Sequence, residues 1–165
     1  MEALLATPIN RFELLLGKIV PYFLLGMGSM VLSTVVAVGV FGMPFRGSVL
    51  MLTAVSAVFM LASLGQGLLI STLFHNQLVA AQASILSAFL PAFYFSNFVF
   101  EVDSMPWPLQ AIAWAIPANY YVSSLQTLFL TGNIWSVLLP DLAALLAIAL
   151  GFLFLTAWYT RSRLD

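Results

Sequence analysis

The chain has 165 residues, of which 62% are hydrophobic and only 7% are charged, whereas soluble domains have about 25% charged residues. So few charges cannot cover the core of a soluble domain, and a formal net charge of −1 offers no field for nucleic acid. The absence of cysteine excludes disulfides, thiolate metal sites and cysteine nucleophiles. We therefore expect an all-α membrane protein with a single transmembrane domain over residues 1–165.

Residues 1–18 are predicted to form a cytoplasmic segment with an interfacial helix. Thr7 is a good N-cap and Pro8 suits the first turn of a helix, so a helix begins there. Its apolar residues fall near one face, while Arg11 and Lys18 take other faces. Physics alone leaves two alternatives open, a plain anchor at the membrane surface or a docking element for a partner.

Four apolar stretches are long enough to cross a bilayer as helices, which takes about 20 residues. These predicted spans are residues 19–41, 49–74, 78–98 and 142–159. The turn signal Gly42-Met43-Pro44 separates the first two. His75-Asn76-Gln77 separates the second and third, and so short a link predicts antiparallel neighbours.

The segment of residues 101–140 is rich in tryptophan, tyrosine and proline. Pro117 divides it into two pieces, each too short to span a membrane, and Gly132 is a helix stop. We predict a short re-entrant helix pair that dips into the outer leaflet. Its aromatic residues are typical of an anchoring belt at the membrane boundary, and binding of an amphipathic substrate is the alternative.

The basic residues predict the orientation. With four crossings, Arg11, Lys18, Arg161 and Arg163 share one side and Arg46 lies on the other. Positive residues favour the cytoplasmic side. Both termini are therefore expected in the cytoplasm, and the protein in the plasma membrane, or the inner membrane of a bacterium.

The chain shows no signature of catalysis. Gly17-Lys18 lacks the upstream glycine and the following hydroxyl residue of a phosphate-binding loop. The predicted spans contain no ionisable residue at mid-depth, which argues against a membrane-embedded enzyme or a proton-coupled carrier. We therefore predict no catalytic residue, no metal and no cofactor in this chain.

Polar and small residues within the spans suggest helix contacts. Gln66, Gln82 and Asn97 could line a polar path, although hydrogen bonds between helices are the alternative. Small residues four apart, such as Ser63 with Gly67 and Ala147 with Gly151, permit close helix packing.

Two stretches are similar to one known family. MEALLATP at residues 1–8, continued by ELLLGK at residues 13–18, resembles the cytoplasmic loop of type-2 ABC exporter permeases. FVFEVDSMPW at residues 98–107, with Ile116-Pro117 and FLTG at residues 129–132, resembles the outer segment that follows the fifth span of this family. Both occur in the expected order.

The resemblance implies a permease that exports drugs, lipids or polysaccharides, works as a homo- or heterodimer and is driven by a separate ATPase subunit that binds ATP and Mg. The implied ATPase-coupling residues are Glu2, Leu4, Leu5, Thr7, Pro8 and Arg11. The implied outer re-entrant residues are Glu101, Met105, Pro106, Trp107, Pro117 and Gly132. Family members have six spans, so Met1 would be an internal methionine in a C-terminal portion. The alternative is a non-transporting assembly or immunity protein, or an inactive permease fragment.

Overall fold

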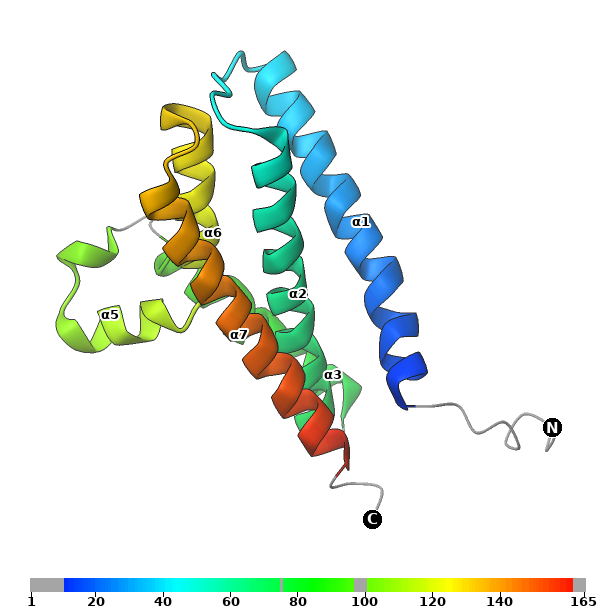
Figure 1. Cartoon of the computed structure of the whole chain (residues 1–165). Helices are drawn as coiled ribbons and strands as arrows, with labels where there is room; N and C mark the ends of the chain where they lie inside the picture. The colour runs from blue at the N-terminus through cyan, green and yellow to red at the C-terminus, as the bar shows by residue number, and fades with distance from the viewer. Residues whose placement is uncertain (1–10, 75, 97–100, 162–165) are drawn as a thin grey trace.

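The structure is a computed structural model that describes residues 11–74, 76–96 and 101–161. Within these ranges the regular structure is entirely helical, without β-strands (Figure 1). Four helical segments are long and apolar enough to cross a membrane: Ile19–Gly39, Val49–Leu73, Gln77–Tyr94 and Trp135–Tyr159. The prediction of an all-α membrane protein is confirmed.

The helices follow one another with short links. Their bounds are α1 Arg11–Gly39, α2 Val49–Leu73, α3 Gln77–Ser84, η1 Ile85–Phe89, α4 Leu90–Tyr94, η2 Val102–Ser104, α5 Trp107–Trp114, α6 Pro117–Gln126, η3 Thr127–Thr131 and α7 Trp135–Arg161. The segments η1 and η3 are π-helices. α3, η1 and α4 follow one another without a gap and form one continuous rod, and η3 continues α6 in the same way.

α7 begins at Trp135, whereas the predicted last span began at residue 142. Pro140, the last residue of the predicted segment 101–140, lies inside α7. A membrane helix tolerates an internal proline when neighbouring groups satisfy the freed backbone. The earlier start brings Asp141 into the helix.

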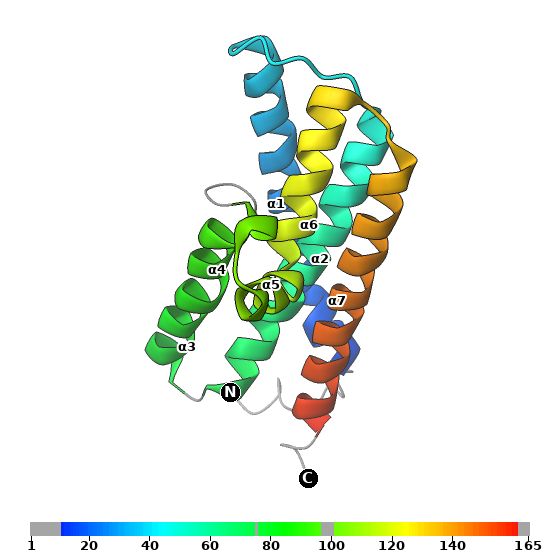
Figure 2. The same cartoon turned by 90° about the vertical axis from the view of Figure 1, so that its left-hand side faces the viewer.

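α2 is the central helix of the bundle. It packs most extensively against α7 and also contacts α1 and α6 (Figures 1 and 2). In Figure 1, α5 lies to the side of the bundle and runs transverse to the long helices, and α6 packs against α7 and α2. The spans Ile19–Gly39 and Gln77–Tyr94 bury none of their described residues inside the chain. Their apolar faces therefore need lipid or another protein as a cover.

Close packing occurs at a different glycine from those predicted. A side-chain carbon at Gly67 or Gly151 would meet nothing within 4 Å, so neither glycine makes the expected close contact. At Gly65 it would lie 3.1 Å from Cβ of Phe152. Thr156 of α7 also donates a hydrogen bond to the Gly65 carbonyl at 3.4 Å. Gly65 is thus a point of close contact between α2 and α7, which leaves no room for a side chain there.

The loops at one end of the bundle fix α2 against η3 and α7. A core cluster of Leu52, Leu128 and Leu138 lies there. The backbone N–H of Ser48 donates to Oδ1 of Asn133 at 2.9 Å, and Gly132 takes a φ of +102° beside the carbonyl of Arg46. This φ is accessible to glycine and strained for other residues.

Candidate functional site

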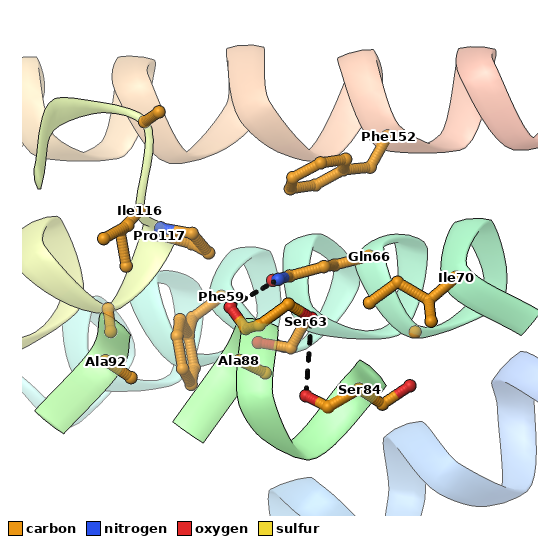
Figure 3. Close-up of a pocket in the computed structure, with 14 residues that line it drawn as sticks. Phe59, Ser63, Gln66, Ile70, Ser84, Ala88, Ala92, Ile116, Pro117 and Phe152 are labelled. Atoms are coloured by element: carbon orange, nitrogen blue, oxygen red, sulfur yellow. Dashed lines mark hydrogen bonds between the residues drawn. The ribbon is translucent and has the colours of Figure 1, made fainter. Parts of the chain in front are cut away.

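A cavity of about 180 Å³ opens where α2, the α3–η1–α4 rod, the α5–α6 link and α7 meet (Figure 3). Its apolar walls include Phe59 and Ile70 of α2, Pro117 of α6 and Phe152 of α7. Phe152 points from α7 toward α2, so the two most tightly packed helices also border the cavity. The cavity is therefore a feature of the helix packing and is made by segments far apart in the sequence.

Gln66 fills a gap in the helical hydrogen bonding of the opposite wall. Its Nε2 donates to the backbone carbonyl of Ser87 at 3.3 Å (Figure 3). In an α-helix that carbonyl would accept from residue 91, but residue 91 is proline and has no N–H. The carboxamide of Gln66 thus supplies a donor to a carbonyl that Pro91 cannot serve. The structure shows a hydrogen bond between helices at Gln66, and its role in a polar path stays a prediction.

The wall that receives this bond is itself irregular. Residues 85–89 form the π-helix η1, with Pro91 in the first turn of α4. The Ser87 hydroxyl donates to the Ser84 carbonyl at 3.5 Å. π-helical turns often occur at functional positions, because they displace side chains from the α-helical register. Here Ser84, Ser87 and Ala88 line the cavity.

An aromatic stack supports the cavity wall at Phe59. The rings of Phe59 and Tyr121 lie 4.1 Å apart with an interplanar angle of 4°. The Tyr121 hydroxyl is in turn 3.1 Å from Oγ of Ser56, which is buried in α2. Tyr121 of α6 thus contacts two residues of α2, with its ring on Phe59 and its hydroxyl on Ser56.

Asp141 is the one charged residue that is buried in the described part of the chain. The Ser124 hydroxyl, which is fully buried in α6, donates to its Oδ2 at 3.1 Å. Asp141 lies in the second turn of α7, so the last span carries an ionisable residue that the predicted boundary left outside. The described residues contain no group of three or more His, Cys, Asp and Glu that could hold a metal.

The predicted outer residues lie around α5 and α6. Glu101 precedes η2, Pro106 precedes α5 and Trp107 is the first residue of α5. The carbonyl of Met105 accepts a hydrogen bond from Nε2 of Gln110 at 3.0 Å. Pro117 is buried at the start of α6, and Gly132 ends η3. Two short helices lie on either side of residues 115–116, and their re-entrant position in the outer leaflet stays a prediction.

Two other predicted residues, Gln82 and Arg11, are not among the described residues that line the cavity. Gln82 is exposed on α3. Arg11 is the first residue of α1. The remaining residues lie outside the described ranges: Glu2, Leu4, Leu5, Thr7, Pro8, His75 and Asn97. Sequence reasoning missed the cavity, the Phe59–Tyr121 stack and Asp141, although the pairing of Gln66 with Pro91 has a visible signal in a proline inside an apolar span.

Residues 1–158 match the family described as ABC-2 family transporter protein. The chain belongs to this family. It is 50% identical, over all 165 residues, to the "Probable multidrug ABC transporter permease YbhS" of Escherichia coli strain K12, of which it covers 44%. It is 29% identical over 153 residues, 92% of the chain, to the "Inner membrane transport permease YhhJ" of the same strain, of which it covers 41%.

A further relative is the "Probable multidrug ABC transporter permease YbhR" of Escherichia coli strain K12, which is 25% identical over 147 residues, 85% of this chain and 39% of YbhR. The ABC-2 family chain thus spans less than half the length of these curated relatives. No solved structure matches it. The predicted family resemblance is confirmed, and the apolar helices are those of an integral membrane protein of this family.

Proposed function

We propose that this ABC-2 family chain forms the membrane-spanning part of an ATP-driven exporter that moves a substrate out of the cytoplasm. The observation that carries the proposal is the family match over residues 1–158, in a chain with four helices long enough to span a membrane. The relatives are named as permeases. In this proposal the chain itself carries no catalytic residue.

The proposed orientation puts both termini in the cytoplasm, with the protein in the bacterial inner membrane. It is supported by the positions of the helix ends, since α1 begins and α7 ends at the same end of the bundle (Figure 1). Arg11 and Arg161 are at these ends, and Arg46 lies in the loop at the opposite end. The excess of basic residues at one end favours that end as cytoplasmic.

The proposed drive is a partner ATPase subunit that binds ATP and Mg. It docks on residues 2–8 and Arg11, and its movement enters the bundle through α1. α1 contacts α2, which packs on α7. A displacement of α1 therefore has a mechanical route to the cavity wall, because α2 carries Phe59 and Gln66.

A second permease copy, identical or related, completes the proposed transporter. This is supported by the spans Ile19–Gly39 and Gln77–Tyr94, whose described residues are not buried within the chain. Phe89 and Leu86 of η1 are about 60% exposed. Lipid covers whatever part of these faces the partner copy leaves open. Among drugs, lipids and polysaccharides, the name of YbhS favours a drug.

The test is reconstitution of the full-length protein with its ATPase in vesicles, followed by ATP hydrolysis and efflux of a fluorescent drug. Glu2→Ala and Arg11→Ala are expected to lower both rates, because they remove charge from the proposed docking segment. Gln82→Ala, at an exposed position of α3, is the control and should leave both unchanged. If the rates of ATP hydrolysis and efflux are unchanged by the substitutions at Glu2 and Arg11, the proposed coupling is wrong.

A further inference from the structure

We infer that the cavity between α2, the α3–η1–α4 rod, the α5–α6 link and α7 is a binding site for a neutral molecule with one aromatic ring and one hydrogen-bonding substituent, such as a phenol. This site lies within one copy of the chain. The inference does not depend on export, because it concerns binding to the chain alone.

The first reason is size. The cavity has a volume of about 180 Å³, and an apolar cavity of about 150 Å³ in a protein interior is known to hold benzene. A single ring with one small substituent therefore fits.

The second reason is the absence of charge. The described side chains that line the cavity include no Asp, Glu, Lys or Arg. Phe59, Ile70, Ile116 and Phe152 supply an apolar surface from three separate segments. Moving an ionised ligand into such surroundings would carry a large desolvation cost without a compensating partner. The ligand should therefore be neutral.

The third reason is a set of polar groups that the protein does not use. The hydroxyls of Ser63 and Ser84 line the cavity and have no hydrogen-bond partner among the described residues. Gln66 uses its Nε2 for the Ser87 carbonyl, which leaves its amide oxygen available as an acceptor. Two rotatable hydroxyls and one acceptor match a ligand with a single hydroxyl or amine substituent.

The fourth reason is a preformed aromatic wall. Phe59 is stacked on Tyr121, and the tyrosine hydroxyl contacts Ser56. Because the ring of Phe59 is already held, a ligand ring can pack against it without first ordering it. Aromatic pairs in offset or edge-to-face contact gain stability beyond their buried area. A planar aromatic ligand is thus favoured over a flexible acyl chain, which would leave the two hydroxyls unpaired.

The test uses the purified chain in detergent, with 4-azidophenol as a photoreactive probe and mass spectrometry of the labelled peptides. Labelling is expected on α2 and on the α3–η1–α4 rod, and excess phenol should suppress it. Cyclohexanol, which has a similar size but no aromatic ring, should compete more weakly. No ATP is added, so a failure to bind is separate from a failure to export.

Two matched glycine variants test the location. A side chain at Gly67, which lines the cavity, or at Gly151, which is exposed on α7, would meet nothing within 4 Å. Both helices should therefore form with leucine, which also has a higher helix propensity than glycine. Gly67→Leu fills the cavity and should reduce labelling about tenfold, whereas Gly151→Leu should leave it unchanged.

Three results would overturn the inference. Equal labelling of the Gly67→Leu and Gly151→Leu variants would place the probe elsewhere. Labelling that phenol does not suppress would show non-specific reaction. Suppression by phosphatidylcholine in vesicles, without suppression by phenol, would identify the occupant as a lipid acyl chain.

Discussion

Pro91 and Gln66 should be energetically coupled, although they lie on different helices. Gln66→Met removes the donor to the Ser87 carbonyl and keeps a long, flexible side chain. In the wild-type background that carbonyl is then left without the bond. Pro91→Ala restores a backbone N–H four residues after Ser87, so the helix can supply its own donor. Gln66→Met should therefore destabilise the wild type more than the Pro91→Ala variant.

The size of the effect follows from hydrogen bonds between membrane helices, which contribute about 0.6 kcal/mol on average and at most about 1.7 kcal/mol in double-mutant cycles. We expect a coupling of about 0.6 kcal/mol, no more than the average, because at 3.3 Å the bond is slightly longer than most N–H···O bonds. For a chain of this size, this corresponds to roughly 1–2 °C in melting temperature.

The assay is thermal unfolding of the four proteins of the cycle in one detergent. The cycle cancels the change in side-chain solvation at Gln66 and the change in helix propensity at Pro91, since each occurs in two of the four proteins. Gln82→Met is the matched control at an exposed glutamine of α3. If Gln66→Met lowers the melting temperature equally in the wild type and in the Pro91→Ala variant, Gln66 and Pro91 are not coupled and the reasoning is refuted.

Three further substitutions test other contacts. Ser124→Ala removes the donor to buried Asp141 and should lower the unfolding free energy by about 1–3 kcal/mol, measured by the melting temperature in detergent. Tyr121→Phe loses only the contact with Ser56, so it should lower the unfolding free energy by about 1 kcal/mol, also measured by the melting temperature. Gly132→Ala puts a side chain at φ +102°, ψ −153°, which should cost about 1–3 kcal/mol, again measured by thermal unfolding.

Each of these substitutions has a control. Adding Asp141→Asn to Ser124→Ala should recover part of the lost stability, because it removes the buried carboxylate, and no recovery would contradict that account. Tyr121→Ala should cost more than Tyr121→Phe, and equal costs would mean that the stack contributes nothing. Gly42→Ala, at φ +63° with nothing within 4 Å, should lower the unfolding free energy less than Gly132→Ala. Equal losses would mean that the nearby Arg46 carbonyl makes no difference at Gly132.

The candidate site could be predicted from the sequence only in part. Gln66 was recognisable as a polar residue in an apolar span, but its partner is a backbone carbonyl that any residue possesses. Asp141 was missed because Pro140 was taken as the end of an irregular segment, whereas the helix passes through it. The close contact at Gly65 was missed because the predicted spacing rule applies equally to several small residues on α2.

Composition and hydropathy determined that the chain is a helical membrane protein, because a long stretch without charge must bury its backbone polar groups in internal hydrogen bonds when lipid surrounds it. Short motifs likewise determined the family, since they are local in sequence. Only the tertiary structure decided which faces of α2 meet α7, α6 and η1. These contacts depend on where the helices cross. α2 and α7 are predominantly apolar on every side, so no periodicity in their sequence distinguishes the face on the cavity from the face on lipid.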